Sequence, residues 1–92
     1  MIHTQLQDFM KQIQLQILTF GIAKEIIGKQ IFDIDLPENS TVQNLKNTLF
    51  EQYPELGKLK SLSIAVNNEY AESDYALSTS DEIALIPPVS GG

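Results

Sequence analysis

The order in which two kinds of hydrophobic spacing follow one another is the feature that most constrains the fold. Apolar residues recur at every second position within residues 13–20, 31–36 and 62–66, which is the period of β-strands. Residues 41–53 instead carry apolar side chains three and four apart, which is typical of an amphipathic helix. A short apolar run at 83–86 is typical of a buried central strand. The predicted order is strand, strand, helix, strand, minor element, strand.

Both ends of the predicted helix are marked by particular residues. Ser40 and Gln43 stand at the spacing of a capping box, in which the Ser40 hydroxyl accepts the Gln43 amide and the Gln43 side chain bonds back. Pro54 disfavours helical backbone at Tyr53, so the helix is expected to end there. The apolar stripe of this helix then needs a sheet to cover.

The connections between the predicted elements carry turn signals. Residues 22–28 are predicted to link the first two strands and to end at Gly28, which is free to take a positive φ. Residues 55–61 are predicted to be an exposed connection. Asn67-Asn68 is a predicted turn because asparagine tolerates the left-handed backbone conformation.

The predicted order of elements is that of an α+β fold of the β-grasp, or ubiquitin-like, kind. Such a fold has a mixed sheet with one main helix packed across one face. The minor element is expected to be a short strand or turn near residues 75–77. A right-handed crossover through the helix places the last strand beside the first, in parallel.

Both faces of the predicted sheet are apolar near the last strand. Leu18 and Phe20 have opposite parity to Ile17 in the first strand, and the run at 83–86 is apolar at both parities. One helix can cover only one of these faces, so the other is a candidate protein interface. The predicted interface residues are Leu18, Phe20, Ala84 and Ile86.

Chain length and composition indicate a single folded unit. At 92 residues with 42% hydrophobic and 20% charged residues, the chain supports one compact core. Three segments are predicted. Residues 1–12 are an N-terminal extension, either helical or disordered, residues 13–86 are the β-grasp domain, and residues 87–92 are an extended C-terminal tail.

The charge balance restricts the partners. Six lysines against twelve acidic residues give 6 − 12 = −6, and the chain has no arginine. This sign disfavours nucleic acid and anionic membrane surfaces. Without arginine the chain also lacks the planar group best suited to clamping phosphate. A basic protein partner is therefore favoured.

The chain offers no convincing catalytic group of its own. Cysteine is absent and the one histidine, His3, is expected to be solvated. A set of acidic residues without an intervening lysine suggests two alternatives, a metal site or a solvated or partner-facing surface, and the second is favoured because the spacing is irregular. The set is Glu69, Glu72, Asp74, Asp81 and Glu82. The absence of a signal peptide or a long apolar run makes a cytoplasmic location the expectation.

The C-terminal segment Pro87-Pro88-Val89-Ser90-Gly91-Gly92 is predicted to project from the domain. Consecutive prolines hold an extended backbone without amide donors. Two glycines leave the terminal carboxylate free to enter a narrow pocket. Chance or an expression remnant explains a Gly-Gly end by itself, but not a rigid proline pair directly between it and an apolar strand.

Five motifs resemble those of a known family, the small subunits of molybdopterin synthase, which belong to the ubiquitin-like sulfur carriers. The resemblance covers about residues 15–92, and its C-terminal motif is the most specific. The motifs are the stretch from Phe20 to Gly28, Thr41-Val42 with Leu45, Ile64-Ala65-Val66-Asn67, Asp81-Glu82-Ile83-Ala84, and Pro87 to Gly92. The family usually has arginine where Lys24 stands and glycine where Ser80 stands.

The resemblance implies a sulfur-carrier function. A ubiquitin-activating-like adenylyltransferase, using ATP and Mg²⁺, would adenylate the Gly92 carboxylate, which sulfur then converts to a thiocarboxylate. The large subunit of molybdopterin synthase would receive that end and deliver sulfur to cyclic pyranopterin monophosphate, in an assembly of two small and two large subunits. Gly92 is then the reacting residue, and residues 87–91 give access. This chain would bind no cofactor itself.

Three alternatives remain open from the sequence. The chain is a sulfur carrier for thiazole synthesis or transfer-RNA thiolation, a protein modifier that forms isopeptide bonds, or a binding module whose Gly-Gly end is incidental. The Pro-Pro-Val-Ser segment favours the molybdopterin branch over the thiazole branch.

Overall fold

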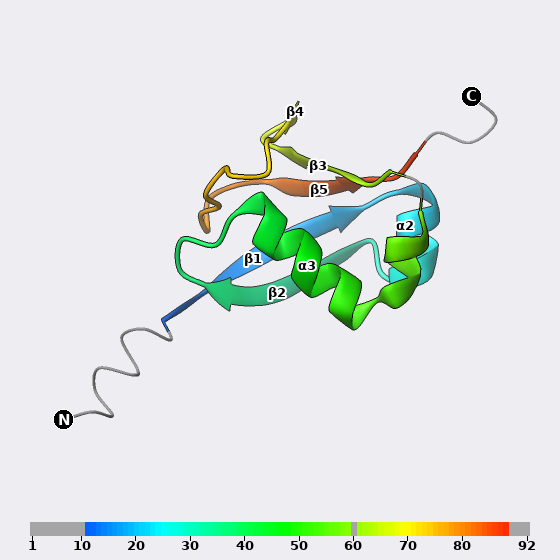
Figure 1. The fold of residues 1–92 in the computed structure, drawn as a ribbon, viewed down its shortest axis with the longest axis horizontal. Coiled ribbons are helices and arrows are strands. Elements are labelled where there is room, and N and C mark those ends of the chain that lie inside the picture. Colours follow the sequence, from blue (N-terminus) through cyan, green and yellow to red (C-terminus); the bar gives the residue numbers. More distant parts are fainter. Residues whose placement is uncertain (1–10, 60, 89–92) are drawn as a thin grey trace.

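The computed structural model describes residues 11–59 and 61–88, which form a five-stranded sheet with two α-helices and a 3₁₀ helix (Figure 1). The elements are β1 (Gln12–Thr19), α2 (Gly21–Ile27), β2 (Ile31–Pro37), α3 (Val42–Gln52), η1 (Pro54–Lys58), β3 (Ser63–Val66), β4 (Glu69–Tyr70) and β5 (Ile83–Ile86). Most of the predicted extension at 1–12 lies outside the described residues, and Gln12 already belongs to β1.

The strand order is β2-β1-β5-β3-β4, which places the last strand in the middle of the sheet. β1 and β5 are parallel, with Ile17 opposite Ile83, whereas β1 with β2, β3 with β5, and β3 with β4 are antiparallel. This mixed sheet with its parallel central pair confirms the predicted β-grasp fold.

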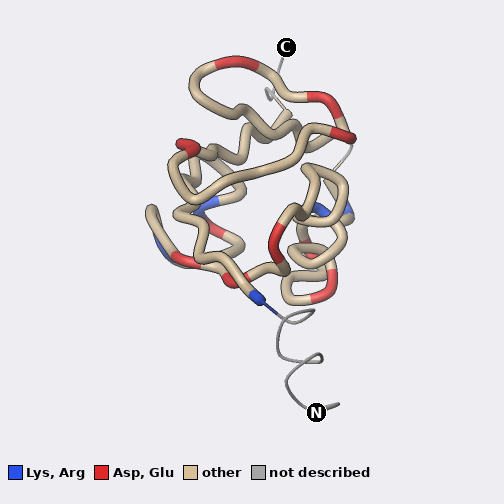
Figure 2. Tube along the Cα trace, turned by 90° about the vertical axis from the view of Figure 1, so that its left-hand side faces the viewer, with Lys and Arg blue, Asp and Glu red and all other residues tan. Residues whose placement is uncertain are grey.

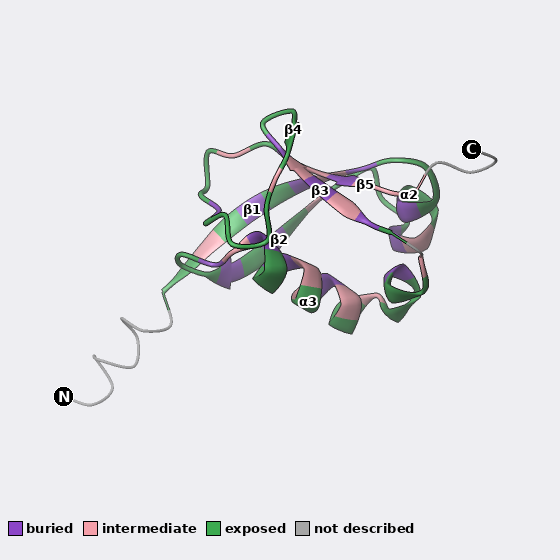
Figure 3. Ribbon diagram, turned by 45° about the horizontal axis from the view of Figure 1, so that its top comes forward, coloured by how far each residue is buried: buried purple, intermediate pink, exposed green. Residues whose placement is uncertain are grey.

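The core lies between the sheet and α3, which crosses one face of the sheet (Figures 1 and 3). Val42, Leu45 and Leu49 form the buried stripe of the helix. Four residues of the two central strands that are fully buried in this core are Leu15, Ile17, Ile83 and Leu85. Burying one such side chain contributes about 1.5–3 kcal/mol, so these residues carry much of the fold's stability.

The capping box of α3 begins one residue later than the sequence pattern predicted. The Thr41 hydroxyl accepts the Asn44 amide at 3.2 Å, and the Asn44 side chain accepts the Thr41 amide at 2.8 Å. Ser40 is buried instead, and its hydroxyl donates to the carbonyl of Pro37 at 2.6 Å. The prediction of a Ser40–Gln43 box was wrong because Ser40 closes the preceding turn and cannot also cap the helix.

The connection predicted at 22–28 is largely the short helix α2. Gly28 ends it in the left-handed conformation, with φ of 86°, and its amide donates to the carbonyl of Lys24 at 2.7 Å. The predicted positive φ at Gly28 is confirmed. Ala23 and Ile27, one turn apart, are the buried residues of α2, too short a repeat to be recognised as a helix.

Residues 55–61 were predicted to be an exposed connection, which is wrong at Leu56. The 3₁₀ helix η1 follows Pro54, and Leu56 on it is fully buried in the core. Its amide donates to the carbonyl of Tyr53 at 2.9 Å, which turns the chain directly after α3. The proline therefore ends α3 as predicted but starts another helical turn.

The loops between β3 and β5 follow the predicted turn chemistry. Asn67 and Asn68 have φ of 54° and 71°, which confirms the predicted asparagine turn and pairs β3 with the two-residue strand β4. Near the predicted minor element, Ala76 forms an isolated bridge with Thr41, and Leu77 is buried. These contacts attach the long loop to the start of α3.

Candidate functional site

The face of the sheet opposite α3 carries a row of apolar and aromatic residues that crosses all five strands. Backbone pairing places Leu18 opposite Ile31 on one side and opposite Ala84 on the other, and places Ala65 opposite both Ala84 and Tyr70. Because paired residues point to the same side of a sheet, these five residues form one row across it. We call this side of the sheet the open face.

Large side chains on the open face are exposed to solvent, whereas those on the face beneath α3 are buried. Phe20, Ile31 and Tyr70 are 47%, 51% and 73% exposed, whereas Ile83 and Leu85 are 0% exposed. Figure 3 shows the same contrast along β5, where buried and half-buried residues alternate. A cluster of large apolar side chains left in water is typical of a protein interaction surface.

A groove of about 420 Å³ runs over the open face. It is lined by Leu18, Phe20, Ala65, Asn68, Tyr70, Glu82, Ala84 and Ile86. All four residues predicted as an interface are among them, so the structure brings together Leu18, Phe20, Ala84 and Ile86.

Sequence reasoning missed Ile31, Ala65 and Tyr70. Ile31 has the same parity as the polar Asp33 and Asp35, so its exposure was readable from the alternation in the second strand. Ala65 and Tyr70 join the row only through the register of β3 with β4 and β5. The strand pattern alone does not give that register.

The described chain leaves the sheet at the end of β5, next to Ile86 of the open face. Ile86 ends β5, and Pro87 and Pro88 follow it, both half-buried. A Cβ placed on Gly21 would lie 3.4 Å from Cγ of Pro87, so this proline packs beside the junction of β1 and α2. Val89, Ser90, Gly91 and Gly92, which the sequence predicts to be the access segment and reacting end, lie outside the described residues.

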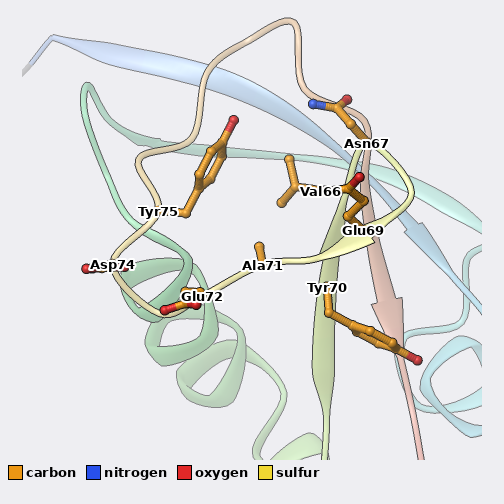
Figure 4. Close-up of a pocket in the computed structure, with 8 residues that line it drawn as sticks. All are labelled: Val66, Asn67, Glu69, Tyr70, Ala71, Glu72, Asp74 and Tyr75. Atoms are coloured by element: carbon orange, nitrogen blue, oxygen red, sulfur yellow. The ribbon is translucent and has the colours of Figure 1, made fainter.

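A second hollow of about 460 Å³ lies beside the hairpin of β3 and β4 (Figure 4). It is lined by Val66, Asn67, Glu69, Tyr70, Ala71, Glu72, Asp74 and Tyr75. Three of the acidic residues considered above as metal ligands border it, but within residues 11–59 and 61–88 no group of three or more histidine or acidic side chains is placed to hold a metal ion.

Asp81 connects this loop region to the start of β5. Its carboxylate accepts the side-chain amide of Asn67 at 3.0 Å and the backbone amide of Ser78 at 3.0 Å. The Tyr75 hydroxyl lies 3.4 Å from the same carboxylate, and the negative charge of Asp81, followed by burial and this hydrogen bond, raises the pKa of Tyr75 above 10.0. Asp81 therefore has a structural role, because its carboxylate holds the asparagine turn against the start of β5.

Acidic residues outnumber lysines along the described trace (Figure 2). The one ion pair within the described ranges joins Lys58 and Glu55 of η1 at 3.7 Å, with both side chains largely exposed. No helix among the described residues is long and apolar enough to cross a membrane.

The mixed sheet, the crossing helix and the central C-terminal strand define a β-grasp protein of the ubiquitin-like class. The chain belongs to the ThiS family, whose model matches residues 17–92. A molybdopterin synthase sulfur carrier subunit from Dictyostelium discoideum is 46% identical over 83 residues, covering 86% of this chain and 96% of that protein.

Two solved structures share the fold along most of this chain. SAMP1, a small archaeal modifier protein from Haloferax volcanii, is 26% identical with a TM-score of 0.73, covering 86% of this chain and 99% of that one. A chain in a complex of subunits 1 and 2 of the molybdopterin-converting factor from Helicobacter pylori is also 26% identical. Its TM-score is 0.60, with coverage of 87% and 100%.

Proposed function

We propose that this chain is the sulfur-carrying small subunit of molybdopterin synthase, acting in the cytoplasm in molybdenum cofactor biosynthesis. The observation that carries the proposal is that β5 contributes Ala84 and Ile86 to the open face and then continues directly into the C-terminal segment. A partner seated on Ala84 and Ile86 is adjacent to Pro87 and Pro88, so docking and delivery of the chain end are coupled. The family match and the similarity to a sulfur carrier subunit support the same assignment.

The chemistry begins at the carboxylate of Gly92, which is a poor electrophile. A ubiquitin-activating-like adenylyltransferase binds ATP and Mg²⁺, and the carboxylate attacks the α-phosphorus of ATP, releasing pyrophosphate. A sulfur nucleophile then attacks the acyl-adenylate carbon and displaces AMP, which leaves a thiocarboxylate on Gly92.

The thiocarboxylate then transfers its sulfur in the active site of the large subunit. Its sulfur attacks a carbon of cyclic pyranopterin monophosphate, and the bond from that carbon to an oxygen leaving group breaks as the carbon–sulfur bond forms. Water then hydrolyses the resulting thioester, which leaves sulfur on the pterin and restores the carboxylate. The catalytic acids and bases are supplied by the partner.

The similarity to one chain of a two-subunit complex supports a large-subunit partner. We propose an assembly of two small and two large subunits, in which the open face contacts the large subunit. The adenylyltransferase uses the same face at a different time, because both enzymes must reach the same chain end.

Mass spectrometry of the protein isolated from cells tests the proposed function. We expect a species in which sulfur replaces one oxygen of Gly92, and we expect sulfur transfer with the large subunit to require it. Removing Gly92 should abolish transfer while leaving binding to the large subunit within about twofold, because the docking residues are unchanged. Conjugates of higher mass in place of the sulfur-bearing species would support a protein modifier, and full activity without Gly92 would show that the Gly-Gly end is incidental.

A further inference from the structure

The open face changes character along the strand direction. Its apolar half, defined above by the row from Ile31 to Tyr70, lies next to the end of β5 that continues into Pro87. Two residues away from that end, earlier along β1 and later along the antiparallel β2, Gln16 is paired with Asp33, and two residues further Gln14 is paired with Asp35. Two residues along a strand span about 7 Å, so the apolar row is followed at once by a polar and acidic one.

Glu82 extends this polar half to the start of β5, which lies next to β1 in the sheet. It is exposed, precedes β5, and lines the groove together with Leu18 and Ala84. Its backbone amide donates to the side chain of Asn67 at 3.0 Å, and its carbonyl accepts the Asn67 amide at 2.8 Å. The backbone of Glu82 is therefore held in place at the border of the groove.

The charges on this half are uncompensated within the described residues. No lysine occurs in any of the five strands. The side chains of Asp33 and Glu82 take part in neither an ion pair nor a hydrogen bond with another described residue. An apolar half beside the chain exit and an acidic half away from it make the open face asymmetric.

We infer that Asp33 and Glu82 orient the large subunit on the open face, by pairing with lysine or arginine side chains that flank its apolar docking patch. The inference rests on the proposed function and deepens it. Apolar burial is non-directional, so the apolar row alone allows a partner to sit in more than one orientation. Charges at one end penalise the reversed orientation and favour the one in which the partner's active site lies beside Pro87 and Pro88.

Charge reversal at the two positions tests this inference. The variant Asp33→Lys with Glu82→Lys changes the net charge from −6 to −6 + 4 = −2. The charge-matched control is Glu51→Lys with Asp74→Lys, which also has a net charge of −2 but alters exposed residues on α3 and in the loop after β4. The rate constant for association with the large subunit is measured by stopped flow over a range of salt concentrations, after thermal unfolding shows that both variants are folded.

We expect the Asp33–Glu82 variant to associate about tenfold more slowly than the control at low salt, and the difference to shrink as salt screens the charges. The neutral variant Asp33→Asn with Glu82→Gln should fall between them, which separates loss of attraction from added repulsion. Equal association rates for the two charge-matched variants would show that only net charge matters and would overturn the inference. If the wild-type chain does not bind the large subunit, the proposed function fails together with this inference.

Discussion

At the scale of single residues, Phe20 best separates folding from partner binding. It follows β1 directly, is 47% exposed and lines the groove. Phe20→Asp should leave the thermal unfolding midpoint nearly unchanged, because the side chain is only half-buried. The same change should weaken binding to the large subunit about 4- to 10-fold, since docking can bury only the exposed half of the side chain, which is about half of the 1.5–3 kcal/mol for full burial. Binding is measured by isothermal titration calorimetry.

Ile22 provides the matched control for Phe20. It is 41% exposed, but it lies on α2 and does not line the groove. Ile22→Asp therefore adds the same charge at a similarly exposed apolar position, and we expect binding within about threefold of the wild type. Normal binding by Phe20→Asp, or equal losses in the two variants, would contradict the docking face.

Tyr75 reports on the charge of Asp81. The pKa of Tyr75 is raised above 10.0. The largest cause is the negative charge of Asp81, followed by the burial of the tyrosine and by its hydrogen bond with Asp81. Because the raised pKa belongs to the folded state, its contribution to stability is fully present below pH 10.0 and is lost as the pH rises through the folded value. Asp81→Asn should lower the pKa of Tyr75 towards 10.0, as followed by the ¹³Cζ chemical shift.

A second acidic residue in the same loop controls for general electrostatics. Glu72 lies near Tyr75 in the chain, and its contact with it is through the backbone, where the Glu72 carbonyl accepts the Tyr75 amide at 3.1 Å. Glu72→Gln should therefore change the pKa of Tyr75 less than Asp81→Asn does. Equal changes in both variants would mean that the specific contact with Asp81 is not the cause.

At the scale of the elements, the cap of α3 shows which residue starts the helix. Thr41→Ala should lower the free energy of unfolding by about 1 kcal/mol, because the Asn44 amide then loses its hydroxyl acceptor. Gln43→Ala keeps the cap and removes only the exposed contact with Asn47, so it should cost less than about 0.5 kcal/mol. Urea denaturation measures both, and a larger loss for Gln43→Ala would contradict the observed cap.

The long periodic elements could be predicted from the sequence, and the short ones could not. Strands such as β1 and β2 repeat the two-residue period several times, so a local pattern is enough to identify them. The buried repeat of α2 is a single pair of residues, and η1 buries Leu56 alone. Segments this short become helical only because other parts of the fold pack against them, and the local sequence does not show that packing.

The candidate site divides in the same way. Leu18, Phe20, Ala84 and Ile86 follow from parity on β1 and β5, because adjacent residues of a strand face opposite sides. Tyr70 joins the groove through β4, a strand of two residues that exists only because Asn67 and Asn68 turn the chain back onto β3. Pairing of that kind is set by tertiary contacts, which a strand pattern does not contain.

At the scale of the whole molecule, β5 divides stability and partner binding between its two faces. Leu85 is 0% exposed beneath α3, whereas its neighbour Ala84 lines the groove on the open face. Leu85→Ala should lower the free energy of unfolding by about 2–5 kcal/mol, because it leaves a cavity in the core. Ala84→Gln should change stability by less than about 1 kcal/mol, because its side chain extends into the open groove.

Binding should show the opposite order. Ala84→Gln fills the centre of the groove that a partner's apolar patch must occupy, so we expect affinity for the large subunit to fall about tenfold or more. Leu85→Ala leaves the open face unchanged, and its affinity, corrected for the folded fraction from urea denaturation, should stay within about threefold of the wild type. A large loss of affinity in folded Leu85→Ala would mean that the two faces are coupled through β5. The affinity of the open face for its partner would then depend on how tightly α3 packs on the other side of the sheet.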